Sequence, residues 1–252
     1  MIAIVTGATG GIGYEFVRYL LSEGKVDEVW AVARNEEKLE HLRIKYGEKV
    51  IPVAADLGTR EGLRVIEKKL AKEHQKVKYL INNAGVARFA RSDLFTAEEI
   101  SATIDINCKA PLILTKICLP YMKRGSRILN VSSASSFQPT PFINLYASTK
   151  VFLRYYSRAL GVELKKKGIV VTAVCPGWVD TEMLLEESNG NKIHFPGITS
   201  AENVVKTALR DSKLRRPLSI CTGYAKFLYI YGKLMPDSVV MRQWMWGIRK
   251  YI

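Results

Sequence analysis

Short apolar runs alternate with longer amphipathic stretches along most of the chain. The short runs are rich in Val, Ile and Ala and indicate β-strands, whereas the stretches between them carry the three- and four-residue spacing of helices. The strands predicted in this way span residues 2–6, 28–33, 50–54, 78–82, 126–131, 169–175 and 217–221. Strands that are apolar throughout and separated by helices are typical of a parallel sheet covered on both faces. The pattern therefore predicts an α/β fold: a doubly wound parallel sheet of about seven strands with helices on both faces.

Two segments fall outside this regular alternation. Residues 182–198 belong to an irregular stretch after the sixth predicted strand, and residues 223–252 continue beyond the seventh as two helices broken at Pro236. No linker rich in Pro, Gly or Ser divides the chain, and 252 residues suit one α/β domain. We therefore expect a single domain over residues 1–252.

Residues with distinctive chemistry follow six consecutive predicted strands. They are Thr6–Gly13 after the first strand, Arg34 after the second, Asp56 and Leu57 after the third, Asn82–Gly85 after the fourth, Ser132 and Ser133 after the fifth, and Pro176 and Gly177 after the sixth. The carboxyl ends of parallel strands share one edge of the sheet, where open α/β sheets bind their ligands. The sequence therefore predicts one composite site at that edge.

The first of these segments is a glycine-rich turn between a strand and a helix. Gly7, Gly11 and Gly13, with Thr9 and Ile12 among them, would let the backbone approach a pyrophosphate at the helix N-terminus. Turns of this kind also occur without a ligand, so the turn alone does not decide the question.

Arg34 bears on which dinucleotide such a turn would bind. An acidic residue at the end of the second strand would bind the ribose 2′-hydroxyl and repel a 2′-phosphate, whereas an arginine offers that phosphate a charged, planar partner. An isolated arginine at this place would more simply be an exposed residue that opens a polar helix. Because Arg34 follows the glycine-rich turn, it favours NADP(H) over NAD(H).

Composition and charge narrow the class of protein. Hydrophobic residues make up 48% of the chain, enough for a sizeable core, and no run of about 20 apolar residues predicts a membrane-spanning helix. The formal charge of +14 favours acidic partners, but the cations are dispersed and no nucleic-acid-binding pattern is present, so we expect no nucleic acid. Four separated cysteines without a histidine set predict no metal site. The chain starts with a strand rather than a signal peptide, which indicates a cytoplasmic protein.

Three residues predict acid–base chemistry. Tyr146 and Lys150 are four positions apart and therefore share one face of a helix. A lysine cation beside a phenol lowers the pKa of the phenol and makes it a usable proton donor and acceptor near neutral pH. That spacing also arises by chance in a chain with 12 tyrosines. Ser133, however, ends the fifth strand 13 positions upstream, so its hydroxyl and the phenol can meet one carbonyl oxygen.

Residues 2–222 resemble the short-chain dehydrogenase/reductase family. The motifs that carry the resemblance are T-G-x3-G-x-G at Thr6–Gly13, Asp56-Leu57, N-N-A-G at Asn82–Gly85, Asn107, Ser133, Y-x3-K at Tyr146–Lys150, and P-G-x-V-x-T at Pro176–Thr181. Each motif is weak or moderate alone, but their order on successive strand ends makes the set specific. The resemblance implies a Rossmann-type fold, an NADP(H)-dependent oxidoreductase, and a homodimer or homotetramer.

The resemblance also implies a role for each site residue. Tyr146 would be the general acid in reduction and the base in oxidation, Ser133 would orient the carbonyl, and Lys150 would bind the nicotinamide ribose and lower the pKa of Tyr146. Asn107 would hold a water that links Lys150 to solvent. The implied cofactor contacts are Gly7, Thr9, Gly11, Ile12, Gly13, Arg34, Asp56 (adenine), Leu57, Asn83 (adenine-side ribose), Ala84, Gly85, Tyr146, Lys150, Pro176, Gly177, and Val179 with Thr181 (nicotinamide carboxamide).

The two irregular segments bear on the substrate. Met183, Leu184, Leu185, Ile193 and Phe195 predict an apolar ketone or aldehyde and its alcohol. Segment 223–252 is aromatic and basic, and two alternatives stay open for it: contact with a membrane surface, or packing over the substrate cleft or a partner subunit.

Two other functions fit the sequence less well than an NADP(H)-dependent oxidoreductase of apolar carbonyls. The length of segment 223–252 argues against a 3-oxoacyl-carrier-protein-type reductase, which the basic charge would favour. A protein that senses NADP(H) without turnover would be expected to lack Ser133, Tyr146 or Lys150, and all three are present.

Overall fold

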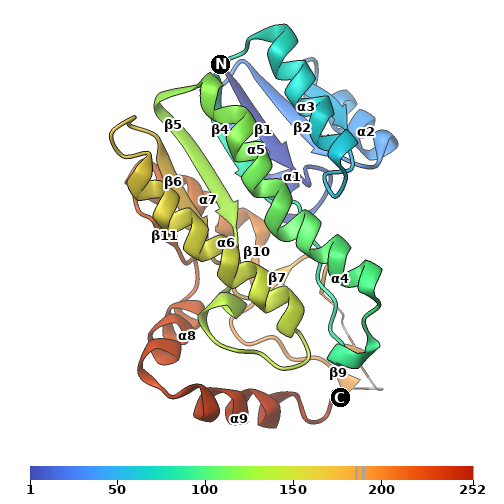
Figure 1. Cartoon of the computed structure of the whole chain (residues 1–252), viewed down its shortest axis with the longest axis vertical. Helices are drawn as coiled ribbons and strands as arrows, with labels where there is room; N and C mark the ends of the chain where they lie inside the picture. Colours follow the sequence, from blue (N-terminus) through green and yellow to red (C-terminus); the bar gives the residue numbers. More distant parts are fainter. Residues whose placement is uncertain (185–186, 189–190, 252) are drawn as a thin grey trace.

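Seven parallel strands form the central sheet of the protein (Figure 1). The structure is a computed structural model and describes residues 1–184, 187–188 and 191–251. In spatial order the strands are β11 (Leu218–Ser219), β6 (Val170–Val174), β5 (Met122–Val131), β4 (Val77–Asn82), β1 (Ile2–Thr6), β2 (Glu28–Ala33) and β3 (Val50–Ala54). Each corresponds to a predicted strand, although the seventh is shorter than the pattern indicated.

Helices cover both faces of this sheet. They are α1 (Gly11–Ser22), α2 (Glu36–Tyr46), α3 (Arg60–Glu73), α4 (Ala97–Ile104), α5 (Ala110–Cys118), α6 (Asn144–Glu163), α7 (Ala201–Lys213), α8 (Gly223–Leu234) and α9 (Asp237–Ile248). Successive side chains of a strand point to opposite faces, so Ala3 and Val5 of β1 join a cluster with α1, α2 and α7, whereas Ile2 and Ile4 join one with α3, α5 and α6. The predicted doubly wound fold is thereby confirmed.

The order of the strands reverses between β1 and β4. From β1 the sheet grows through β2 to β3 on one side and through β4 to β11 on the other, which leaves a crevice outside the carboxyl ends of β1 and β4. Thr6 joins these two ends. Its buried hydroxyl donates to Ile81 O at 3.2 Å and accepts from the backbone N–H groups of Asn83 and Ala84, both at 2.9 Å.

The helical stretch between β4 and β5 is interrupted by one π-helical turn. Residues Asp105–Lys109 form this turn between α4 and α5. Pro111 follows it and has no N–H to donate to the carbonyl of Asn107, and its ring would collide with that carbonyl in a regular α-helix. The wider turn removes the conflict and places Asn107 in the interior, where it is fully buried.

The chain after β6 contains short strands that the sequence pattern did not predict. β7 (Val179–Asp180) pairs with β10 (Thr199–Ser200), and β8 (Glu187–Ser188) pairs with β9 (Asn191–Lys192). Leu185, one of the residues of segment 182–198 that predict an apolar substrate, lies outside the described residues.

The C-terminal helix pair, α8 and α9, ends the described chain. The two helices are separated at Met235 and Pro236, as predicted. They lie beyond the carboxyl ends of the strands, on the side of the composite site (Figure 1). Among the described residues no helix combines the length and the apolar character needed to cross a bilayer.

Candidate active site

The glycine-rich turn after β1 is shaped for close backbone approach. Gly7 and Gly11 have φ angles of +62° and +48°, in the left-handed region that side chains disfavour. A Cβ atom on Gly13 would lie 2.0 Å from Gly7 O. The residue before α1, Gly10, offers no side-chain cap to the first N–H groups of the helix. These donors are therefore available to an anion such as a pyrophosphate.

Asn83 holds this turn against β4. Its Nδ2 donates to Thr6 O at 3.0 Å and to Gly7 O at 3.2 Å, so the side-chain amide is engaged by the turn itself. The predicted contact of Asn83 with a ribose stays a prediction. Thr181 lies over the same turn, because a Cβ on Gly11 would be 3.0 Å from its Cγ2. The segment after β6 is thus brought to the predicted cofactor turn.

Ser133 and Tyr146 meet at the end of β5. Ser133 directly precedes a 3₁₀ turn, Ala134–Phe137, and its Oγ accepts from Ser135 N at 3.1 Å. Tyr146 is in the first turn of α6. Burial raises the pKa of Tyr146, and a hydrogen bond with Ser133 opposes that rise. The expected juxtaposition of these two hydroxyls is present.

Lys150 is held on the same helix one turn later. Its side chain is 4% exposed, and Nζ donates to Val131 O at 2.9 Å. Burial lowers the pKa of Lys150 to about 8. Lys150 Nζ lies 5.5 Å from the centroid of the tyrosine ring, and the pKa of Tyr146 is raised overall because the loss of water around the phenol dominates. The expectation that Lys150 lowers this pKa below the value that burial alone would give stays a prediction.

Gly85 and Asn107 complete the surroundings of Lys150. A Cβ atom on Gly85 would lie 3.0 Å from Asn107 Oδ1 and 3.2 Å from Lys150 Nζ, so only glycine leaves this space open. The amide of Asn107 forms two hydrogen bonds of 2.9 Å with the backbone of Val86 and donates to Thr149 Oγ1 at 3.0 Å. The π-helical turn therefore brings Asn107 near Lys150. The water that Asn107 would hold stays a prediction.

The other predicted cofactor residues lie at neighbouring strand ends. Arg34 is exposed directly after β2. Asp56, after β3, is exposed and accepts from Gly58 N at 3.0 Å, whereas the adjacent Leu57 side chain is 3% exposed and belongs to the core. Leu57 can therefore offer a ligand only its backbone. Arg34 and Asp56 share the edge of the sheet with the catalytic residues and are not in contact with them.

The remaining predicted residues divide between the turn and the end of β6. Thr9 and Ile12 are partly buried in the glycine-rich turn, and Ala84 is tied to Thr6 at the end of β4. Pro176 O accepts from Ala134 N at 2.7 Å, which joins the ends of β5 and β6. Gly177 lies near Ala225 of α8, and Val179 is 7% exposed.

The C-terminal segment, α9 and the residues that follow it, holds two loops beside these residues. Trp244 Nε1 donates to Pro141 O at 2.9 Å, in the loop that leads to Tyr146. Tyr251 OH accepts from His194 N at 3.2 Å, in the predicted substrate segment. Sequence reasoning did not identify Trp244 or Tyr251. Their only signal was the aromatic character of the segment, because their partners are distant along the chain.

Aromatic side chains line both loops. Phe142 stacks on Phe89 with ring centroids 6.0 Å apart, and Trp178 contacts Phe195 at 5.0 Å. Phe142 has a φ of +68°, a strained value for a residue with a side chain, and its carbonyl accepts from Ala90 N at 2.7 Å. This region is thus both apolar and conformationally fixed.

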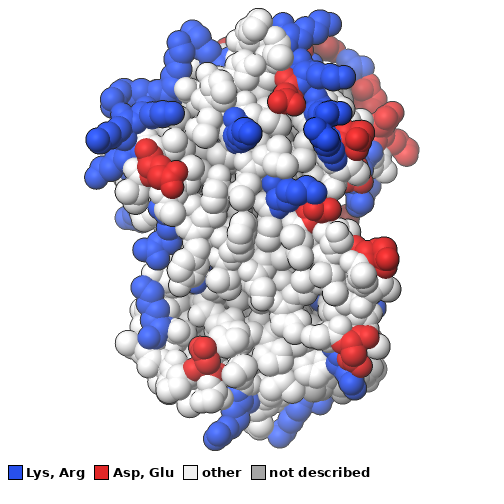
Figure 2. Space-filling view, in the orientation of Figure 1, with Lys and Arg blue, Asp and Glu red and all other residues white. Residues whose placement is uncertain are grey.

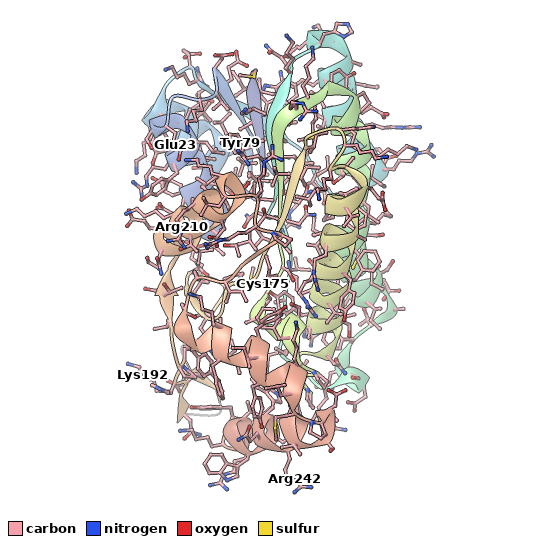
Figure 3. The ribbon with its side chains drawn as sticks, turned by 90° about the vertical axis from the view of Figure 1, so that its left-hand side faces the viewer. Glu23, Tyr79, Cys175, Lys192, Arg210 and Arg242 are labelled. Carbon is pink, nitrogen blue, oxygen red and sulfur yellow. The ribbon has the colours of Figure 1, made fainter. Side chains whose placement is uncertain are left out.

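Figure 3 shows how the interior differs from the ends of the molecule. Cys175, at the end of β6, lies inside, whereas Lys192 and Arg242 point outward at the end that carries α9.

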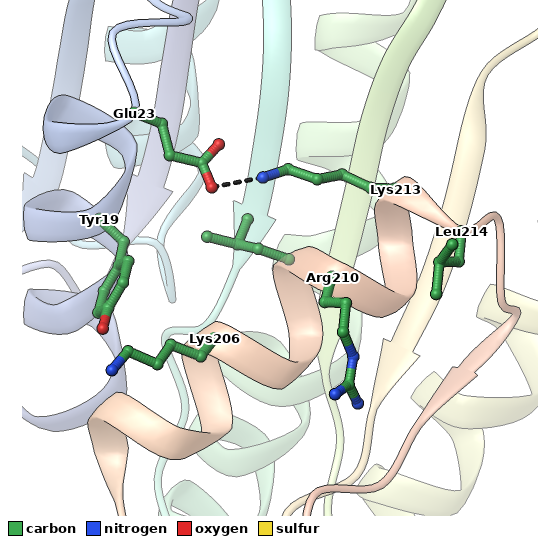
Figure 4. Close-up of a pocket in the computed structure, with 7 residues that line it drawn as sticks. Tyr19, Glu23, Lys206, Arg210, Lys213 and Leu214 are labelled. Atoms are coloured by element: carbon green, nitrogen blue, oxygen red, sulfur yellow. Dashed lines mark hydrogen bonds and ion pairs between the residues drawn. The ribbon is translucent and has the colours of Figure 1, made fainter.

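A hollow of about 380 Å³ lies away from these residues, between α1 and α7 (Figure 4). Two of its lining residues, Lys213 and Glu23, form an ion pair, and none of the predicted site residues lines it. In the described part of the chain no group of three His, Cys, Asp or Glu side chains could hold a metal ion.

Comparison with known proteins identifies relatives of this arrangement. A family model described as short chain dehydrogenase matches residues 1–192. The chain is 32% identical over 253 residues to a very-long-chain 3-oxoacyl-CoA reductase of Anas platyrhynchos, covering 95% of this chain and 77% of that protein. It is 34% identical over 259 residues to hydroxysteroid dehydrogenase-like protein 1 of Gallus gallus, covering 97% and 73%. A short-chain dehydrogenase of Sphingobium yanoikuyae, solved in complex with NADPH, matches with a TM-score of 0.77 and 27% identity, covering 100% of this chain and 96% of that one.

Proposed function

Because this chain belongs to the short-chain dehydrogenase family and is an oxidoreductase of carbonyl and alcohol substrates, we propose that it uses NADP(H) to interconvert an apolar ketone or aldehyde and its alcohol. The convergence of Ser133, Tyr146 and Lys150 at the end of β5 carries the proposal. These residues lie at the same edge of the sheet as the glycine-rich turn, beside the β1–β4 crevice. A dinucleotide bound at that turn would place its reactive ring near them.

The residues of the turn fit a dinucleotide. The Gly7–Gly13 contact leaves no room for a side chain, and the uncapped start of α1 offers N–H donors to a pyrophosphate. Arg34, exposed after β2, supports NADP(H), because its guanidinium suits a 2′-phosphate. The related Sphingobium enzyme binds NADPH. When bound, the nicotinamide supplies or accepts the hydride, and the chain supplies placement and the proton.

Each catalytic residue then has a distinct task during reduction. Ser133 Oγ donates a hydrogen bond to the substrate carbonyl oxygen, which orients it toward Tyr146. The raised pKa of Tyr146, caused by burial, keeps the phenol protonated at neutral pH, so it can deliver its proton as charge develops on that oxygen. Lys150, buried one helical turn away, stabilises the phenolate that remains, because its charge is poorly screened there. Oxidation reverses these transfers.

The substrate proposal rests on the apolar loops. Phe89, Phe142, Trp178 and Phe195 come from the segments that flank Ser133 and Tyr146. The relatives are named for very-long-chain 3-oxoacyl-CoA and for hydroxysteroids. A 3-oxoacyl thioester is therefore the second, narrower candidate within the same class, favoured by the 32% identity to the reductase of that substrate.

The proposed function is tested by following NADPH and NADH oxidation with long and short 3-oxoacyl-CoA, steroid ketones and simple aliphatic ketones. Tyr146→Phe should lower kcat at least about 100-fold while NADPH binding stays within about twofold. Tyr155→Phe is the matched control, because Tyr155 lies on the same helix and is 63% exposed. Arg34→Asp should raise the KM for NADPH about tenfold or more and leave NADH use intact.

Two results would contradict the proposal. Retained turnover in Tyr146→Phe would remove the assigned proton donor. NADPH binding without turnover on every carbonyl tested would indicate a sensor rather than an enzyme.

A further inference from the structure

The outward face of α8 is an apolar stripe edged by lysines. Phe227, Ile230 and Leu234 are 56%, 57% and 76% exposed, and Lys226 and Lys233 are exposed beside them. Residues three, four and seven positions apart share one side of a helix, so these five residues form one continuous surface. We call it the α8 face.

The opposite side of α8 already packs on the protein. The Tyr229 ring meets the Phe137 ring edge-on at 5.1 Å, and a Cβ on Gly232 would lie 2.4 Å from Phe137 O. Ala225 is fully buried. The helix is therefore docked without using its outward apolar residues. A helix that is apolar on both sides normally buries both, in a core or against a membrane.

The charge around the α8 face is strongly one-sided. Residues 223–251 contain five cations and one acid, Asp237, which gives a net charge of +4 (5 − 1). The cations are Lys226, Lys233, Arg242, Arg249 and Lys250. Figure 2 shows Lys and Arg side chains projecting from the end of the molecule where α9 lies in Figure 1. On α9, Trp246 is 68% exposed, with the Arg249 guanidinium 5.1 Å from its ring.

This charge selects among the partners that could cover the apolar stripe. In a twofold contact between copies, the lysines of the α8 face would meet the same lysines, and residues 223–251 supply one acid, Asp237, to offset them. An anionic lipid surface has the complementary charge and also accepts apolar side chains at the boundary between headgroups and acyl chains.

We propose that the α8 face docks on an anionic lipid surface. Phe227, Ile230 and Leu234 enter the headgroup–acyl boundary, and Lys226 and Lys233 bind lipid phosphates. Trp244 of α9 and Tyr251, which follows α9, hold the loops beside Ser133 and Tyr146, so docking brings the substrate side of the protein to the lipid. That last consequence rests on the proposed function, whereas the docking itself does not.

The test is sedimentation of the full chain with vesicles of phosphatidylcholine alone and with about 30% phosphatidylserine, at low and physiological salt. Binding to the anionic vesicles is expected. The combined variant Phe227→Ser, Ile230→Ser and Leu234→Ser should weaken it about tenfold or more, and so should Lys226→Gln with Lys233→Gln. All five side chains are exposed, and unchanged circular dichroism and Tm would verify the fold of each variant.

Two control variants separate docking from the general positive charge of the protein. Lys165→Gln with Lys166→Gln removes the same charge from the exposed segment after α6, and Val162→Ser removes an apolar side chain that is 75% exposed on α6. Both should bind as the unchanged protein does. Equal losses in the lysine variants would overturn the proposal, because binding would then reflect net charge alone.

Two further outcomes would also overturn it. One is absence of vesicle binding by the unchanged protein. The other is a dimer in solution that the three serine substitutions dissociate, with no effect on vesicles, since the α8 face would then join two copies. Vesicle binding needs no turnover, so failure here and failure of the proposed reaction are distinguishable.

Discussion

At the scale of single residues, Lys150 is a charged group that the fold buries. It is 4% exposed, and among the described residues its ammonium group donates to a backbone carbonyl, Val131 O. Burial lowers the pKa of Lys150 from 10.5 to about 8. The folded protein therefore gives up this proton more readily than the unfolded chain, which links stability to pH.

The sign of this linkage gives a first prediction. Between pH 8 and 10.5 the unfolded chain binds more protons at Lys150, so the contribution of Lys150 to the free energy of unfolding should rise with pH. From pH 7 to pH 10 the contribution is about 2 to 3 kcal/mol. Lys150→Met should lack this increase, which urea unfolding at the two pH values would measure. Lys165→Met, at an exposed position, should keep it. Identical pH profiles for all three proteins would contradict the assigned shift.

Gly13 gives a second prediction at this scale. In Gly13→Ala the new Cβ would lie 2.0 Å from Gly7 O and 2.6 Å from Asn83 Nδ2, and both neighbours are fixed in the turn. We expect a loss of about 2 kcal/mol or more in stability together with weaker NADPH binding. Gly10→Ala is the matched control, because its backbone is extended and nothing lies within 4 Å of its Cβ. Thermal unfolding and NADPH fluorescence would measure both effects. Equal behaviour of the two variants would refute the steric argument.

The catalytic residues were predictable from the sequence because their signals are local. Tyr146 and Lys150 share one helix, and Ser133 ends the strand before it, so spacing alone brings them near one another. The holding role of Asn83 was not predictable, since its partners Thr6 and Gly7 are more than 70 positions earlier in the chain. The raised pKa of Tyr146 was missed for a related reason: burial by distant segments leaves no trace in a five-residue motif.

At the scale of elements, the C-terminal helix pair shapes the approach to the site. Trp244 of α9 fixes Pro141, five positions before Tyr146, by one hydrogen bond of 2.9 Å. Such a bond is worth about 0.5–1.5 kcal/mol, which corresponds to a factor of up to about ten in an equilibrium. Loss of this bond would therefore be expected to weaken the binding of a large substrate that contacts the loop.

Trp244→Phe should therefore raise the KM for a long apolar substrate about three- to tenfold and change kcat much less, because the aromatic ring remains and only the donor is lost. A short ketone should show a smaller change, since it makes fewer contacts with the loop. Trp246→Phe, two residues later and 68% exposed, is the control and should leave both constants unchanged. Steady-state kinetics with the two substrates would show it. An equal effect of both substitutions would mean that Trp244 has no positioning role.

Strands that form continuous apolar runs were predicted together with their boundaries. The first three strands agree at both ends, because each is an apolar run closed by a turn or a cap. The two-residue strands β7 to β10 have no such pattern, since they form only where other segments supply their partners. The π-helical turn before Pro111 was missed because the apolar spacing continues through it unchanged.

At the scale of the whole molecule, the site is shared between two parts of the chain. The sheet presents the catalytic residues at its carboxyl edge, and the C-terminal segment returns to that edge, where Trp244 of α9 and Tyr251 after α9 hold one loop each. The sequence indicated the sheet and its functional edge through repeated local patterns. It left open where the C-terminal helices pack, because an aromatic segment can bury its rings against many surfaces. The structure shows that they pack over the loops of the site.

The hydrogen bond between Pro141 and Trp244 has a consequence for folding during synthesis on the ribosome. The two residues are 103 positions apart, and ribosomes add about 5–20 residues per second, so roughly 5 to 20 s separate their synthesis. During that interval Ser133, Tyr146 and Lys150 are all made, while the loop that leads to the tyrosine still lacks its bond to Trp244. A nascent chain can thus build its sheet well before this loop gains the support that the C-terminal segment provides.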